Sequence, residues 1–315
     1  MNFQGATNQN GSTKEGENLR ESNKAKTTGL SATIQMKDKL NIMVPVDFTP
    51  VSYRAIEFLA FLMDRTPINT HLVHVIEVNS AEWAGSIAAS DTLNKAELTE
   101  EVQLAEQKFT SLKQHVDFRF TMEIVFGGLT TSLATYADQH SIDLIIMGTA
   151  GADGWLEKIS GSEAQHVVRF THVPVITIHR DAAISPIHNL LWVADFEAEK
   201  QPEQSIATIK MLQQLFHAKI HLLQIINLED EDRAQQLRGK MQTFAEQLGL
   251  QRYELHLHRN YKVPAGVRNF NEVSAMDLVL IGTHGRKGIS HLLYGSIAET
   301  LVNHCIRPLM TYHLD

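Results

Sequence analysis

The sequence contains an internal repeat, and this repeat restricts the possible folds more than composition does. Landmarks of the first copy return 134 residues later in the second. The pairs are Asp143 and Asp277, Gly148 and Gly282, Gly161 and Gly295, and Pro174 and Pro308. A constant offset of this kind indicates two copies of one domain. Asp47 and Asp195 are 148 residues apart, so the first copy has about 14 extra residues, which we place in 79–91.

Each copy alternates short apolar runs with helical patterns. Runs such as 143–148, "DLIIMG", and 277–282, "DLVLIG", are apolar on both faces, which is typical of parallel strands covered by helices. Helices are predicted near 204–215 and 232–248. A long helix is predicted from the spacing of Leu98, Val102, Ala105, Phe109 and Leu112, and a strand from the alternation of Phe118, Phe120, Met122 and Ile124. The fold class is therefore α/β, with two repeated doubly wound domains.

The predicted organisation is a tail followed by two domains. Residues 1–37 are rich in Asn, Gly, Ser, Thr and Lys, and we expect a disordered tail there. The domains are expected at 38–181 and 185–315. Apolar residues make up 43% of the chain, enough for two cores.

Composition also argues against several classes of protein. The net charge of −8 provides no long-range attraction to nucleic acid or to an anionic membrane, and no apolar run approaches the roughly 20 residues of a membrane span. A single cysteine, Cys305, excludes an internal disulfide, and a cytoplasmic location is expected. No metal site is predicted, because His71 and His74 point to opposite faces of one strand and no carboxylate or cysteine cluster is evident near His256 and His258.

Both copies carry a glycine-rich segment after an apolar run, at 147–162 and 281–296. Glycine allows a phosphate to approach main-chain N–H groups closely. We expect Gly148 and Gly151 to turn the chain away from the strand, and Gly161 and Ser162 to open a helix whose free amides bind an anion. Neither copy matches the P-loop pattern of Gly, four residues, Gly, Lys and Ser or Thr. Ligands of open parallel sheets bind beyond the carboxyl ends of the strands, where Asp47 and Asp195 also lie.

In this arrangement the chain resembles the universal stress protein family, and specifically its tandem members. Both copies have the family pattern of Gly, two residues, Gly, nine residues, Gly and Ser. The resemblance implies a five-stranded parallel sheet of the adenine nucleotide alpha hydrolase-like, Rossmann-like type in each domain, with ATP at its carboxyl edge. It also implies that Asp47 or Asp195 binds the adenosine portion and that main chain near Val75 or Ile225 faces the adenine.

The residues predicted to bind nucleotide divide between the two copies. They are Pro45, Asp47, Val75, Met147, Gly148, Gly151, Gly161 and Ser162 in the first copy, and Asp195, Ile225, Ile281, Gly282, Gly285, Arg286, Gly295 and Ser296 in the second.

Which copy holds nucleotide stays open. The first has acids at Asp153 and Glu163, which repel a triphosphate unless Mg²⁺ intervenes, whereas the second has Arg286 and Lys287. The second copy departs from the family pattern in the segment around Asp195, "VADFEAEKQPEQS", residues 193–205.

Purely structural explanations compete at each site. Ser162 and Ser296 fit a helix-capping pattern, alone or combined with phosphate contact. Asp47 could simply accept a main-chain hydrogen bond in the turn before Thr49 and Pro50.

The leading prediction is an ATP-binding regulatory protein of the stress response, without catalytic residues. A slow ATPase or phosphotransferase and an interaction scaffold without nucleotide are the alternatives. The resemblance also implies that the last strands, 173–179 and 307–313, pair edge to edge. Within one chain this gives an intramolecular pseudo-dimer, with an intermolecular homodimer as the alternative.

Overall fold

The computed structural model describes residues 39–78, 92–150, 161–196, 201–226, 231–283, 300–302 and 305–314. The predicted tail and much of both glycine-rich segments lie outside these residues. None of the described helices is both long enough and apolar enough to cross a membrane.

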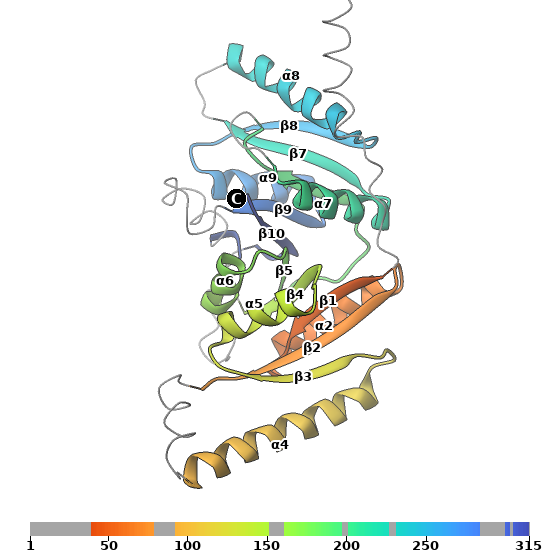
Figure 1. Ribbon diagram of the computed structural model, residues 1–315. Helices are drawn as coiled ribbons and strands as arrows, with labels where there is room; N and C mark the ends of the chain where they lie inside the picture. The colour runs from red at the N-terminus through yellow and green to blue at the C-terminus, as the bar shows by residue number, and fades with distance from the viewer. Residues whose placement is uncertain are drawn as a thin grey trace, which may run out of the picture.

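Ten strands form one sheet in the order β3-β2-β1-β4-β5-β10-β9-β6-β7-β8 (Figure 1). The strands are β1 (Leu40–Pro45), β2 (Ile68–Ile76), β3 (Thr121–Phe126), β4 (Leu144–Thr149), β5 (Val175–His179), β6 (Asn189–Val193), β7 (Lys219–Ile226), β8 (Tyr253–Arg259), β9 (Leu278–Thr283) and β10 (Leu309–His313). Strand pairs within each half are parallel, as the alternation of strands and helices predicts. The five strands of the second half have the same order as those of the first when each half is read from its outer edge towards the middle of the sheet.

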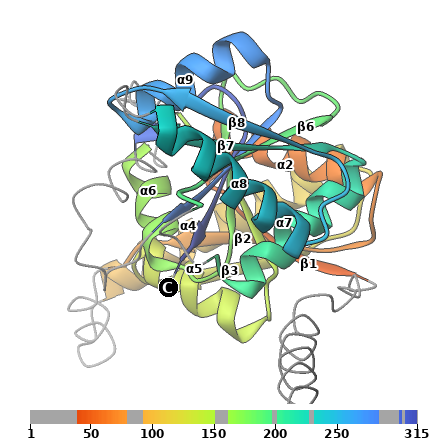
Figure 2. The ribbon, with the colours of Figure 1, turned by 90° about the horizontal axis from the view of Figure 1, so that it is seen from above.

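Helices cover both faces of the sheet. They are α2 (Pro50–Met63), α4 (Thr92–His115), α5 (Leu129–Gln139), α6 (Gly161–Phe170), α7 (Glu203–Phe216), α8 (Glu231–Gln247) and α9 (Val263–Ser274). The long helix α4 and helix α8 lie at opposite ends of the molecule (Figure 1). Helices α7 and α9 lie on opposite sides of β7 and β8, as seen from above (Figure 2).

The core consists of two apolar clusters, one on each face. Because strand side chains alternate in direction, Ile42 and Val44 enter the cluster beneath α2, α4, α7 and α8, whereas Met43 enters the cluster beneath α5, α6 and α9. Each cluster contains residues of both halves, so the two repeats are stabilised by shared burial of apolar surface.

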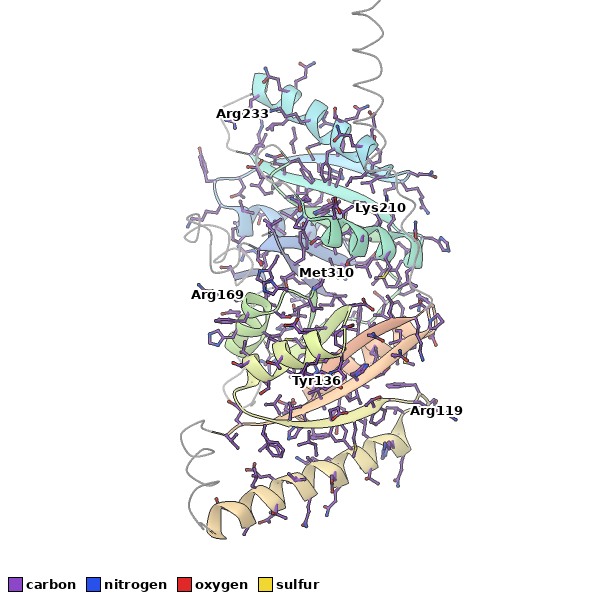
Figure 3. The ribbon with its side chains drawn as sticks, viewed as in Figure 1. Arg119, Tyr136, Arg169, Lys210, Arg233 and Met310 are labelled. Atoms are coloured by element: carbon purple, nitrogen blue, oxygen red, sulfur yellow. The ribbon has the colours of Figure 1, made fainter. Side chains whose placement is uncertain are left out.

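The two halves meet where β5 and β10 pair antiparallel, with Leu309 opposite Thr177 and Thr311 opposite Val175. These are the strands whose edge pairing was predicted. Met310 lies at this junction, in the middle of the molecule (Figure 3). The pairing gives each of the two strands a second neighbour, so neither leaves its edge open.

The main difference from the predicted elements concerns the strand expected from Phe118. Strand β3 begins only at Thr121, although Phe118 and Phe120 still pack against the core. Both side chains are partly buried, but the ladder with β2 starts at the pair of His71 and Thr121. Helices α7 and α8 lie where the apolar spacing predicts them.

Candidate functional site

The turn after β1 is organised by the carboxylate of Asp47. Its Oδ1 accepts hydrogen bonds from the main-chain N–H of Thr49 at 3.0 Å and from the Thr49 hydroxyl at 2.7 Å. Thr49 in turn caps α2, whose first residue is Pro50. One oxygen of Asp47 therefore has the structural role that we considered as the alternative to ligand binding.

The other oxygen of Asp47 has no such role. Oδ2 is buried and has no hydrogen-bond partner. Unpaired buried carboxylate oxygens are costly, because they lose their water without gaining another donor. The next residue, Phe48, has a positive φ of 62°, which is strained for a bulky side chain. Local strain and an unpaired oxygen together mark the end of β1 as a binding site candidate.

Asp47 lies in the wall of a cleft of about 460 Å³ at the carboxyl edge of the first half. Its lining comes from the ends of β1 and β2, from α4 and from the start of α5. The residues are Pro45, Val46, Asp47, Phe48, Val73, His74, Val75, Ile76, Glu77, Glu101, Leu104, Ala105, Lys108 and Leu129. Three predicted residues, Pro45, Asp47 and Val75, are thus brought together.

The main chain of Val75 is directed towards this cleft. The ladder between β1 and β2 ends at Pro45 and Val73, and the carbonyl of Val73 accepts from Val46 N–H at 2.9 Å. Since main-chain directions repeat every two residues in a strand, the N–H and C=O of Val75 point to the same side, beyond the end of β1. A planar ligand in the cleft would meet one donor and one acceptor there.

Charged side chains of both signs line the cleft. Lys108 Nζ lies 5.2 Å from the centre of the Phe48 ring, and Phe48 packs edge-on against Phe109 at 4.9 Å. Glu77 and Glu101 supply negative charge on the same walls. A triphosphate would therefore need a cation or the amides of a helix terminus beside it.

The position of Gly148 corrects one prediction. Gly148 does not turn the chain away from the strand, because β4 continues to Thr149. A Cβ at Gly148 would lie 2.1 Å from the carbonyl oxygen of Val51 in α2. This glycine is needed for the close approach of a helix to a strand. The neighbouring Met147 side chain is fully buried in the core, so only its main chain is available to a ligand.

The remaining glycine-loop residues lie mostly outside the described residues. This applies to Gly151, Gly285, Arg286, Gly295 and Ser296. Gly161 is the first residue of α6, as expected for a helix that begins at the end of the loop.

In the second half, Asp195, Ile225, Ile281 and Gly282 line a common cleft of only about 60 Å³. Gln224 reaches across it, because its Nε2 donates to Asp195 Oδ1 at 3.0 Å and its Oε1 accepts from Phe196 N–H at 3.3 Å. The equivalent residue of the first half, His74, instead lies 2.7 Å from the carbonyl oxygen of Val46. The acid of the second half is therefore already bonded to the protein.

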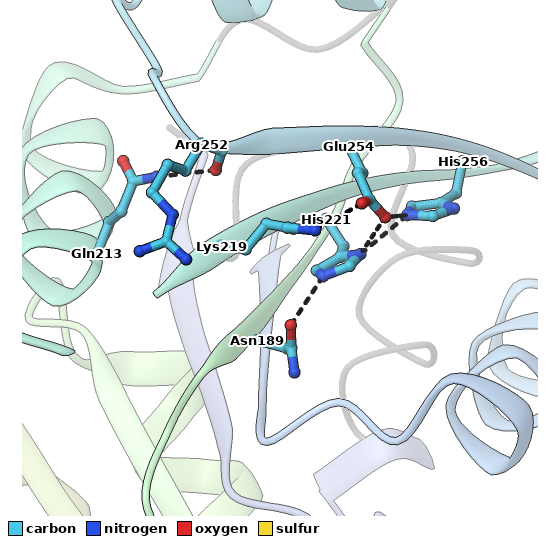
Figure 4. Close-up of polar contacts among 7 residues, drawn as sticks. All are labelled: Asn189, Gln213, Lys219, His221, Arg252, Glu254 and His256. Atoms are coloured by element: carbon cyan, nitrogen blue, oxygen red, sulfur yellow. Dashed lines mark hydrogen bonds and ion pairs between the residues drawn. The ribbon is translucent and has the colours of Figure 1, made fainter. Parts of the chain in front are cut away.

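Our expectation that no carboxylate lies near His256 is wrong. Glu254 and His256 are on the same face of β8, and His221 faces them from β7 (Figure 4). The alternation Glu-x-His in a strand was the available signal, because residues two apart share a face. The register with β7, which adds His221, is a long-range property.

The sequence model of the universal stress protein family matches residues 40–179 and 192–313. The chain belongs to the universal stress protein family.

Relatives within the universal stress protein family match at low identity. Universal stress protein MJ0531 of Methanocaldococcus jannaschii is 23% identical over 139 residues, covering 44% of this chain and 81% of that protein. Universal stress protein MJ0577 of the same organism is 24% identical over 152 residues, covering 44% of this chain and 94% of that protein.

Two solved structures illustrate the similarity over most of the chain. A universal stress protein from Archaeoglobus fulgidus superimposes with a TM-score of 0.67 at 15% identity, covering 87% of this chain and 98% of that one. A second, from Pseudomonas aeruginosa, has a TM-score of 0.56 at 14% identity, covering 90% and 95%. At this identity the similarity shows the fold of the universal stress proteins.

Proposed function

We propose that this universal stress protein binds an adenine nucleotide at the carboxyl edge of its first half and acts as a nucleotide-dependent regulator of the stress response. The observation that carries the proposal is the buried, unpaired Oδ2 of Asp47 in the wall of the 460 Å³ cleft. We place the protein in the cytoplasm, where ATP is available.

The chemistry of the cleft suits a nucleoside. A carboxylate oxygen without a donor is satisfied by a ribose hydroxyl, in a hydrogen bond strengthened by the negative charge. The donor and acceptor of the Val75 main chain suit the edge of a base. The cleft also falls within the range of about 300–1,000 Å³ that is typical of small-molecule sites.

The phosphates would extend towards the start of α6. The proposed contacts are the main-chain N–H groups of Gly151 and Gly161, the Ser162 hydroxyl and the positive end of the helix dipole. We propose Mg²⁺ as the accompanying cation, because acids such as Glu77 lie in the cleft wall.

We propose the first half as the better site. A cleft of about 60 Å³ is too small for a nucleoside, and the Asp195 carboxylate already accepts from Gln224. The second half, within proposed limits of 185–315, would then pair with the first, within 38–181, as a pseudo-dimer through β5 and β10.

The decisive variant is Asp47→Asn. Its Oδ1 still accepts from Thr49, so the turn is preserved, but an NH₂ group replaces the unpaired Oδ2. Losing a hydrogen bond to a charged group costs about 1.5–3 kcal/mol, so we expect about 10- to 150-fold weaker binding of ATP and Mg²⁺ in calorimetric titration.

The matched control is Asp195→Asn, for which we expect unchanged ATP affinity. Titration of the unaltered chain should give one nucleotide per chain. A stoichiometry of zero would favour the interaction scaffold, and unaltered affinity in Asp47→Asn would refute the assigned role of Asp47. Release of inorganic phosphate would indicate the ATPase alternative.

A further inference from the structure

Three potential metal ligands meet on the α9 face of the sheet, where β7 and β8 lie side by side (Figure 4). His221 Nδ1 lies 2.9 Å from His256 Nε2. Glu254 Oε2 lies 3.5 Å from His221 Nδ1 and 3.7 Å from His256 Nε2. Within the described parts of the chain, this is the only group of at least three His, Cys, Asp or Glu side chains compact enough to hold one ion.

We propose that His221, Glu254 and His256 bind one Zn²⁺ ion. Zinc bonds to imidazole nitrogen and carboxylate oxygen at about 2.0–2.2 Å, so two ligand atoms of a tetrahedral site are about 3.3–3.5 Å apart. The three separations in the structure, 2.9, 3.5 and 3.7 Å, lie close to this value. In the metal-free chain the 2.9 Å contact is a hydrogen bond, so the ion would displace the hydrogen on His256 Nε2 and lie among three atoms that are spaced close to one face of a zinc tetrahedron.

The protonation state of His221 suits this role. Its Nε2 lies 3.1 Å from Asn189 Oδ1, an acceptor, so Nε2 carries the hydrogen and Nδ1 presents its lone pair to the ion. Metal-binding histidines commonly donate their second N–H to such an acceptor, which orients the ring. Asn189 is thus a positioning residue for the site.

Glu254 is positioned in a similar way from the other side. Lys219 Nζ lies 2.6 Å from Oε1, which leaves Oε2 directed at the two rings. Exposure falls across the cluster, from 47% for the Glu254 side chain to 26% for His256 and 8% for His221. An ion would enter past Glu254, and water would fill the fourth position, as in three-ligand zinc sites.

The first half offers an internal comparison. The residue opposite His71 in β3 is Thr121, whereas Glu254 lies opposite His221 in β8. His71 Nδ1 instead lies 2.9 Å from the hydroxyl of Tyr136. We therefore expect one zinc ion per chain. His221 is also four residues before Ile225, or about 13 Å along β7, so the site is separate from the carboxyl edge.

The test uses the 315-residue chain, stripped with a chelator and titrated with zinc chloride in competition with a chromophoric chelator, without nucleotide. We expect one ion per chain. Glu254→Gln and His256→Gln should each raise the dissociation constant at least about 10- to 100-fold, the effect of losing even a partner of a ligand. Glu254→Gln alters a half-exposed side chain and should leave the circular dichroism spectrum unchanged.

The matched control is His258→Gln, which removes a histidine from the same face of the same strand but outside the cluster. It should bind zinc like the unaltered chain. The proposal is overturned if the chain takes up no zinc, if Glu254→Gln and His256→Gln bind it unchanged, or if His258→Gln weakens binding equally. Anomalous diffraction at the zinc edge should place the ion between the three ligand atoms.

Discussion

Trp192 donates a hydrogen bond of 2.7 Å from its indole Nε1 to the hydroxyl of Tyr312, and that hydroxyl lies 2.8 Å from Gln201 Oε1. All three side chains are buried. Trp192 belongs to β6 and Tyr312 to β10, so the contact crosses the intervening β9.

Because of this contact, Tyr312→Phe should destabilise the fold. The variant leaves the buried Trp192 N–H without its acceptor, which costs about 1–3 kcal/mol in the free energy of unfolding. Urea denaturation measures this loss in the free energy of unfolding. Tyr261→Phe is the control, because that side chain is 71% exposed and should change stability by less than about 0.5 kcal/mol. Equal effects of both variants would contradict the role of the buried contact.

Gly148→Ala should destabilise the protein even without ligand. The added Cβ would lie 2.1 Å from a main-chain oxygen of α2, so helix and strand must separate, at a cost of about 1–3 kcal/mol or more. Gly239→Ala is the control within α8, where nothing lies within 4 Å, and it should stabilise by about 0.5–1 kcal/mol. The thermal unfolding midpoints of the two variants should therefore shift in opposite directions. A neutral Gly148→Ala would show that the close packing is not required.

His71 should make stability depend on pH. Burial, and then the nearby His140, lower the pKa of His71 from 6.5, while Glu123 acts in the opposite direction. Below about pH 6.5 the unfolded chain therefore binds a proton that the folded chain resists, and stability falls as pH falls. Urea unfolding between about pH 7.5 and about pH 5 should show a shallower loss in His71→Gln than in the unaltered chain. Parallel profiles of stability against pH for the two proteins would exclude a contribution of His71.

Tyr136, the hydrogen-bond partner of His71, should make stability depend on pH in alkaline solution. Burial, and then the charge of Glu123, raise the pKa of its hydroxyl from 10.0 to about 12. The unfolded chain then loses its proton first, so stability falls as pH rises from about 10 towards about 12. Tyr136→Phe should remove this part of the loss, which unfolding measurements over that range would detect. An unchanged profile of stability against pH in Tyr136→Phe would contradict this role of Tyr136.

The central strands should be the last to open. β10 is bonded to both β9 and β5, whereas β3 and β8 are the outermost strands. Hydrogen exchange should show β10 amides opening only with global unfolding, and those of β3 and β8 opening at lower free energy. Exchange of β10 as fast as that of β3 would mean that the two halves separate within the folded chain.

Local patterns predicted a large part of this architecture. The apolar runs that became β4 and β9 and the spacing that became α7 and α8 depend on neighbouring residues, so sequence alone revealed them. The prediction was less accurate at β3, because pairing with β2 rather than the apolar pattern sets the start of a ladder. Asp47 was predicted as a site residue from its place after an apolar run, but its two oxygens have different surroundings that only the fold defines.

The sequence by itself determined the family, the repeat and the alternation of strands and helices, because all three follow from the spacing of residues along the chain. The tertiary structure decided which side chains meet. It packed Gly148 against Val51, bonded Gln224 to Asp195, and brought His221 beside Glu254 and His256. Such contacts depend on the register and crossing of segments far apart in sequence, and those are set by packing of the whole core rather than by any local pattern.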